Sequence, residues 1–174
     1  MPEKEVIFEG KTKFDGIFNF KDFYRFAYDW LGDEAQLILM ENKYTEKAKG
    51  ESKDVDVAWD GFRKFTDYFK FDASIKFRIL GLTDVEITDE NGKKIKTNKG
   101  SIEIKVKGTL VRDWQGKFES NGFQKMLRAI YEKFFIQPRV DQLEEKAFDD
   151  LTEFMEQAKA FFATEGRRID IFQP

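Results

Sequence analysis

The chain has 174 residues, 36% of them charged, and a formal net charge of -3. This length fits one domain with a sizeable core, and the nearly balanced charge gives no reason to expect a nucleic-acid surface. The chain has no Cys and no His, which excludes disulfides, thiolate nucleophiles and imidazole as a base or metal ligand.

The sequence has no apolar run approaching the roughly 18 residues of a membrane-spanning helix, and its N-terminus lacks the pattern of a signal peptide. We therefore expect a soluble, cytoplasmic protein without integral membrane association. The 20 Phe are the unusual feature of the composition. They indicate either a core built from aromatic rings or a cavity lined by them.

The N-terminal third predicts a strand, a helix and a second strand. Residues 5–14 alternate between apolar and polar side chains, and Asp15-Gly16 is expected to turn the chain. Asn19 is a suitable N-cap for a helix with an aromatic stripe that ends at Gly32. Residues 35–48 begin apolar and become polar, which indicates a second strand ending at an exposed tip.

The middle of the chain is organised around residues 65–80, whose apolar side chains fall on odd positions. They are Phe65, Phe69, Phe71, Ala73, Ile75, Phe77 and Ile79. A period of two over this length predicts a long antiparallel strand with one buried, largely aromatic face. Val55, Val57 and Trp59 show the same alternation just before it and predict another strand.

Short turn signals divide the following residues into hairpins. Gly81 is expected to interrupt the long strand, and Asn91-Gly92 is a strong two-residue hairpin signal. We expect a further turn at residues 98–100 and a last strand over residues 102–110. These connections predict an antiparallel sheet.

After residue 116 the apolar period changes from two to 3.6, which predicts two helices. One covers residues 121–136 and ends before Pro138, and the other covers about residues 140–164 and ends at Gly166. The predicted fold class is therefore α+β, with a curved antiparallel sheet of about six or seven strands packed against helices and a long C-terminal helix. We expect residues 1–166 to form this single domain and residues 167–174 to form a C-terminal tail.

This order of elements resembles the helix-grip folds of START-like and polyketide-cyclase-like domains, in which a bent antiparallel sheet wraps a long C-terminal helix. The resemblance is one of topology and involves no sequence motif. It implies an apolar ligand cavity between the sheet and the helix.

The first candidate site is the space between the odd face of the long strand and the last helix. The candidate ligand-binding residues are Trp59, Phe71, Ile75, Phe77, Leu151, Met155 and Phe162. Aromatic and Met walls suit an adaptable pocket for an apolar ligand. The alternative is a filled core made of the same side chains.

Three other features have simpler explanations. A lysine cluster at residues 93–107 can contact phosphate groups, but alternating Lys also solvates a strand and protects a sheet edge. Asp54, Asp56 and Asp60 share one face of a strand, where an outer polar face explains them without a metal ion. Ile169, Ile171 and Phe172 of the tail could add a strand to a partner, or pack on their own domain.

No nucleophile with an adjacent base and no phosphate-binding loop is recognisable, so an enzyme ranks third and no cofactor or metal is expected. We expect a non-enzymatic binding module for a small apolar or amphipathic ligand held between the sheet and the C-terminal helix. The alternative is a structural or adaptor protein that acts through self-association, as a homo-oligomer, or through other protein–protein contacts.

Overall fold

The computed structural model describes residues 2–117 and 121–170, and among these it does not describe the side chains of residues 135, 136 and 166–170. These ranges form an α+β fold with one antiparallel five-stranded sheet and three α-helices. The strands are β1 (Glu3–Phe18), β2 (Ile38–Lys49), β3 (Ser52–Lys64), β4 (Phe69–Thr88) and β5 (Lys94–Arg112). The helices are α1 (Phe20–Asp33), α2 (Gly122–Tyr131) and α3 (Gln137–Asp170), with a π-helical turn at Glu132–Ile136 between the last two.

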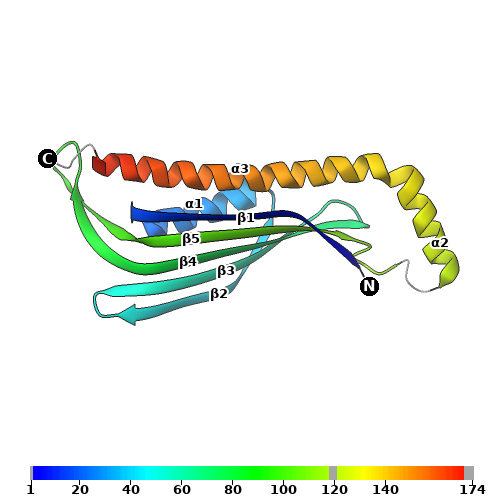
Figure 1. Cartoon of the computed structure of the whole chain (residues 1–174), viewed down its shortest axis with the longest axis horizontal. Coiled ribbons are helices and arrows are strands. Elements are labelled where there is room, and N and C mark those ends of the chain that lie inside the picture. The colour runs from blue at the N-terminus through cyan, green and yellow to red at the C-terminus, as the bar shows by residue number, and fades with distance from the viewer. Residues whose placement is uncertain (1, 118–120, 171–174) are drawn as a thin grey trace.

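The sheet has the order β1-β5-β4-β3-β2, so β1 and β2 are its two edges. Figure 1 shows α1 and α3 on the same face of the sheet, with α3 running along its length. The helix α2 turns away at the N-terminal end of α3 and lies beyond the end of the sheet. The hairpin of β4 and β5 curves toward the opposite end of α3.

The predicted antiparallel sheet is confirmed, but it has five strands rather than six or seven. The sequence signals at residues 81 and 98–100 mark irregularities inside long strands and do not end them. Gly81 has φ +63 at a register shift between Leu80 and Thr83, after which β4 and β5 stay paired as far as Thr88 and Lys94. A Cβ at Gly100 would lie 3.1 Å from the Leu80 carbonyl oxygen, so this glycine permits a close backbone approach.

The boundaries predicted for the C-terminal helices are also wrong. Pro138 is the second residue of α3 and does not separate two helices, because a proline in a first helical turn needs no backbone N–H. The π-helical turn precedes it without a break in the helical chain. Gly166 lies inside α3, which continues to Asp170.

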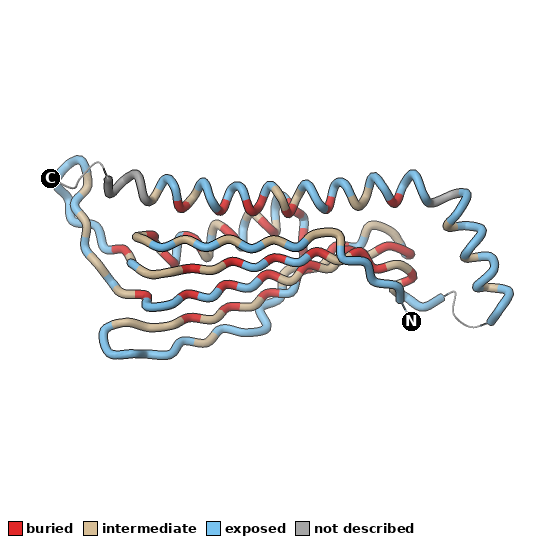
Figure 2. Tube along the Cα trace, viewed as in Figure 1, coloured by how far each residue is buried: buried red, intermediate tan, exposed pale blue. Residues whose placement is uncertain are grey.

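The core lies between the sheet and the two helices that cover it, as Figure 2 shows by burial. The odd positions of β4 face this core, with Ile75 and Ile79 completely buried, and the predicted alternation is confirmed from Phe69 onward. The stripe of α3 is equally buried at Leu151 and Phe154. Burial of each such side chain contributes on the order of 1.5–3 kcal/mol, so this interface dominates the stability of the fold.

Candidate interaction surfaces

All seven side chains predicted to line a ligand site belong to one buried core, and the most exposed of them, Met155, has only 6% of its surface exposed. The sheet and α3 approach closely here. A Cβ at Gly108 of β5 would lie 2.6 Å from Leu151 Cδ1 and 3.0 Å from the Phe71 ring. The absence of a side chain at Gly108 is therefore what allows Leu151 to sit against the sheet.

Trp59 contributes to the same core, but its aromatic neighbours are on α1 and β4. Its ring lies edge-on to Tyr24 at 5.0 Å, to Tyr28 at 5.6 Å and to Phe77 at 5.0 Å between ring centroids. None of the seven lining residues predicted from the sequence belongs to α1. Its aromatic stripe at helical spacing was the signal that could have done so.

A polar group borders this aromatic cluster at the β2 edge. Glu41 Oε2 accepts hydrogen bonds from the Tyr24 hydroxyl and, at 3.1 Å, from Trp59 Nε1. Burial and the bond to Glu41 raise the pKa of Tyr24 to about 12, so the phenol stays protonated at neutral pH. The contact holds α1 against the edge strand.

Arg63 also holds the helices against the sheet. Its Nη1 donates to the Ala35 carbonyl oxygen at 2.7 Å, and its Nη2 lies 3.2 Å from Asp150 Oδ2. This buried guanidinium therefore connects β3, the segment before β2, and α3. Such contacts fix the relative positions of the elements, because either partner alone would leave a charge in a poorly hydrated site.

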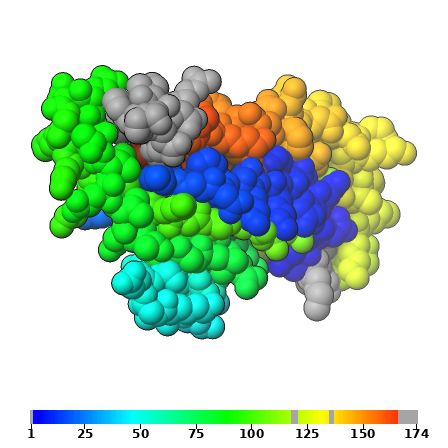
Figure 3. Space-filling model, turned by 60° about the vertical axis from the view of Figure 1, so that its left-hand side comes forward, coloured from blue at the N-terminus to red at the C-terminus, as the bar shows by residue number. Residues whose placement is uncertain are grey.

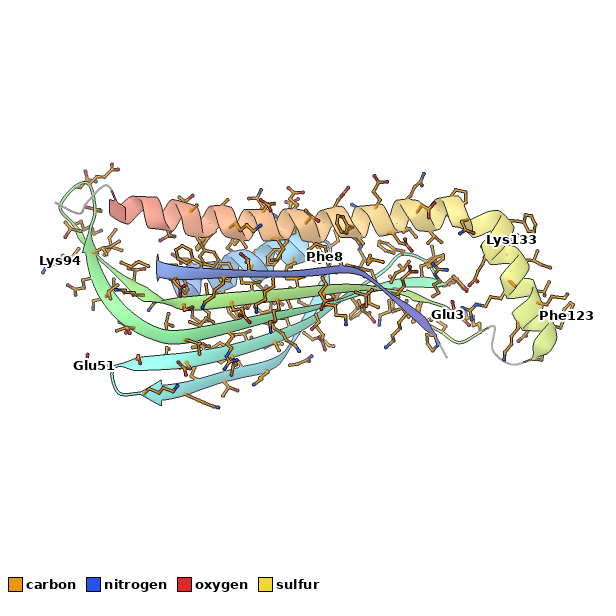
Figure 4. All side chains as sticks on the ribbon, in the orientation of Figure 1. Glu3, Phe8, Glu51, Lys94, Phe123 and Lys133 are labelled. Atoms are coloured by element: carbon orange, nitrogen blue, oxygen red, sulfur yellow. The ribbon has the colours of Figure 1, made fainter. Side chains whose placement is uncertain are left out.

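The helix α2 and the π-helical turn that follows it present an apolar face to solvent, an exposure that was not predicted from the sequence. Six large apolar side chains between residues 123 and 134 are at least 44% exposed, whereas apolar helical faces normally turn toward a core. These residues, which we call the α2 face, are Phe123, Met126, Leu127, Ile130, Tyr131 and Phe134. Figure 4 shows Phe123 at the outer end of α2, far from the body of the protein.

A polar network on the opposite side of α2 explains this orientation. The Arg128 side chain is only 13% exposed, and its Nε donates to Tyr68 Oη at 2.9 Å and to Glu132 Oε1 at 3.0 Å. Its Nη2 lies 3.2 Å from Glu3 Oε2 on β1. The Tyr68 hydroxyl donates to Glu132. The polar side of α2 is thus bound to the sheet, and its apolar side must face outward.

These contacts shift the ionisation of two members of the network. Burial alone would raise the pKa of Glu132, but the hydrogen bonds from Tyr68 and Arg128 outweigh it and hold that pKa below its usual value. Burial, followed by the bond to Glu132, raises the pKa of Tyr68. At neutral pH Glu132 is therefore a carboxylate that accepts from both partners.

The remaining sequence candidates lie on the outer face and at the ends of the sheet. Lys105 Nζ lies 3.4 Å from Glu103 Oε1, as expected where alternating lysines solvate the outer face of a strand. Asp54 Oδ2 lies 2.5 Å from Lys49 Nζ, and Asp54 Oδ1 accepts a hydrogen bond from the Gly81 amide. Asp56 Oδ2 lies 3.8 Å from Lys43 Nζ. Across the described residues, no three or more carboxylates are grouped so that they could hold a metal ion.

Ile171 and Phe172 of the predicted tail lie outside the described residues. No helix in the described part of the chain is both long and apolar enough to cross a bilayer. Comparisons with protein-family models, curated proteins and solved structures found no match to this chain.

Proposed function

We propose that the protein is a non-enzymatic adaptor that associates with a second copy of itself through the α2 face. The observation that carries this proposal is the inverted orientation of α2, in which the Arg128 side chain is only 13% exposed while Phe123 and Phe134 are 65% and 68% exposed. Exposed apolar patches of this kind mark interaction sites in soluble proteins. The polar network holds the helix in place before a partner binds, which lowers the entropic cost of association.

The spacing of the α2 face suits a twofold-symmetric contact. The intervals between its apolar positions are the same whether the sequence is read forwards or backwards. In an antiparallel pair of these helices, each apolar side chain therefore lies opposite another one. The aligned positions are Phe123 with Phe134, Met126 with Tyr131 and Leu127 with Ile130.

The test compares two leucines of almost equal exposure, Leu127 at 44% on α2 and Leu80 at 43% on β4. We expect light scattering after size exclusion to show a dimer for the wild type and for Leu80→Glu, and a monomer for Leu127→Glu. A glutamate in the centre of the pair would place a charge in an apolar contact without a partner. A monomeric wild type, or equal disruption by both variants, would disprove assembly through α2.

A second candidate function is a binding module for a small apolar ligand between the sheet and α3. It is supported by the gathering of the seven predicted side chains in one hydrophobic core, with Met155 and aromatic rings among them. The topological resemblance to helix-grip domains points the same way.

Native mass spectrometry of the freshly purified protein tests this second candidate, with Ile75→Trp as the variant. We expect a non-covalent adduct on the wild type that Ile75→Trp removes while the fold survives. Ile38→Trp, at a 60% exposed isoleucine, is the matched control and should keep the adduct. A clean spectrum with an unfolded Ile75→Trp variant would indicate a filled core.

A further inference from the structure

The face of the sheet that points away from α1 and α3 is covered by no helix of the described residues (Figure 1). The register of the strands places four exposed lysines of this outer face in one row across the sheet. Lys11 of β1 lies opposite Lys105 of β5, which lies opposite Lys76 of β4. The row continues through Ala58 of β3 to Lys43 of β2. We call these four lysines the lysine row.

The next row along the strands shows what solvation of the outer face requires. Its residues alternate in sign across four strands, and they are Lys13, Glu103, Arg78 and Asp56. The lysine row, in contrast, contains no carboxylate. Like charges directly opposite each other on neighbouring strands are destabilising. The lysine row therefore carries a repulsion that solvation does not explain and that an anion from outside the chain would relieve.

Carboxylates of the chain neutralise the lysine row only in part. Glu103 is shared by two of its members, with Oε2 at 3.1 Å from Lys11 Nζ and Oε1 at 3.4 Å from Lys105 Nζ. Lys43 has a longer ion pair of 3.8 Å with a carboxylate on β3. Lys76 has no ion pair with any of the described residues. The centre of the row is thus open to an external anion.

Exposed aliphatic side chains flank the lysine row on the same face. On β2, Ile38 and Met40 are 60% and 54% exposed and alternate with Leu39, which packs against the core. On β4, the exposed Leu80 follows the buried Ile79. An anionic bilayer fits this combination, because its headgroups attract ammonium groups and the boundary of its acyl chains accepts aliphatic side chains.

The outer side of α3 has the opposite charge. Four exposed carboxylates follow each other there at intervals of four residues, and they are Asp141, Glu145, Asp149 and Glu153. Figure 3 shows α3 and the tip of the β2–β3 hairpin on opposite sides of the molecule. A negatively charged surface would therefore attract the sheet side of the protein and repel the side formed by α3, which orients the protein on that surface.

A single-stranded nucleic acid fits this face less well than a bilayer. The lysine row and the row on either side of it contain no aromatic side chain on which a base could stack. The exposed Ile38 and Met40 would also gain no partner from a phosphate backbone. The observations therefore favour a partner that offers both negative charge and an apolar layer.

We propose that the outer face of the sheet is a peripheral binding surface for bilayers that contain anionic lipids. The four ammonium groups of the lysine row lie among the negatively charged headgroups. Ile38 and Met40 reach the boundary of the acyl chains at the β2 edge. This surface is separate from the α2 face, so the proposal does not depend on self-association.

The probe is a vesicle of phosphatidylserine and phosphatidylcholine in equal amounts, and a vesicle of phosphatidylcholine alone is the uncharged control. Co-sedimentation measures the fraction of protein bound as the NaCl concentration is raised. We expect binding to the mixed vesicles that weakens steeply as salt screens the lysines, and none to phosphatidylcholine alone. Equal binding to both kinds of vesicle would indicate adsorption through the apolar α2 face and would overturn the proposal.

Two double variants with the same change in net charge separate the lysine row from charge in general. Lys76→Gln/Lys105→Gln removes two cations from the row, and Lys146→Gln/Lys159→Gln removes two exposed cations from α3. We expect the first variant to bind the mixed vesicles about thirtyfold more weakly, at roughly fivefold for each lysine. The second variant should bind them as the wild type does. All four side chains are exposed, so neither variant disturbs the core.

Ile38→Ser/Met40→Ser tests the aliphatic part of the contact. We expect about tenfold weaker binding to the mixed vesicles, because less apolar surface enters the bilayer. Phe148→Ser, at a 47% exposed position on α3, is the control and should leave binding unchanged.

A thymidine oligonucleotide, which is a polyanion without acyl chains, is the competing probe. Tighter binding of the oligonucleotide than of the mixed vesicles, weakened by Lys76→Gln/Lys105→Gln, would assign the lysine row to nucleic acid and overturn the proposal. The proposal is also overturned if the wild type does not sediment with the mixed vesicles, or if the two lysine variants bind them equally.

Discussion

The two C-terminal helices, α2 and α3, have the same kind of amphipathic sequence but opposite orientations toward the sheet. In α3 the apolar stripe faces the sheet, and Leu151 and Phe154 are completely buried. In α2 the polar residue Arg128 faces the sheet, and Leu127 on the apolar side is 44% exposed. Figure 2 shows the contrast directly, since buried positions line one side of α3 and α2 is mostly exposed.

This contrast teaches that an apolar stripe predicts burial without saying what covers it. The side chains of α3 gain burial within the chain, where shape complementarity around Gly108 accommodates Leu151. The position of α2 is set by a few hydrogen bonds and ion pairs to Tyr68 and Glu3. Stability within the chain is therefore concentrated in α3, and the free apolar surface in α2.

The largest expected difference comes from the same substitution in the two helices. Leu151→Ala should lower the free energy of unfolding by about 2–5 kcal/mol, because it leaves a cavity against β5. Leu127→Ala should change it by no more than about 0.5 kcal/mol in dilute, monomeric protein, because its side chain contributes little to the core. Urea denaturation followed by circular dichroism measures both, and equal losses would contradict the contrast.

A smaller effect is expected when the anchor of α2 is removed. Arg128→Ala should lower the free energy of unfolding by about 1–3 kcal/mol, because Glu132 and Tyr68 lose a charged partner in a partly buried site. Amide hydrogen exchange should accelerate within residues 122–131 and remain slow in the core strands. Arg25→Ala, at an exposed position on α1, is the control and should change neither. Unchanged exchange in α2 would show that other contacts hold it.

The sequence predicted the elements of the core well, because a buried sheet face and its covering helix leave strong periodic patterns. The alternation through Phe71, Ile75 and Phe77 is confirmed, and all three side chains lie in the core. The errors fall at glycines and at Pro138, where one residue type fits two geometries. Gly81 suits a bulge as well as a turn, and Pro138 suits the first turn of a helix as well as a break.

The candidate surfaces were less accessible to sequence reasoning, because they depend on contacts between distant positions. Arg128 and Tyr68 are 60 residues apart, and nothing in the local pattern pairs them. Periodicity identified the apolar residues of α2, whereas their exposure follows from the position of the polar network.

The smallest expected effect is a pH dependence located in that network. The pKa of Glu132 is lowered in the folded protein, so its contribution to stability is present above the unfolded value of about 4.3 and is lost as the pH falls through the folded value. We expect the wild type to melt at a higher temperature than Glu132→Gln at neutral pH, and this difference to shrink as the pH falls to about 3. Glu145→Gln, at an exposed position on α3, is the matched control.

Glu144 has the opposite effect on stability as the pH falls. Each variant is therefore compared with the wild type at every pH. Burial, followed by the nearby Glu5 carboxylate, raises the pKa of Glu144, so its protonation favours the folded state as the pH falls. This contribution is common to the wild type and Glu132→Gln and cancels in their difference. If that difference is constant across the pH range, the carboxylate of Glu132 does not anchor α2, and the orientation of the helix must then depend on Arg128 and its contact with Glu3.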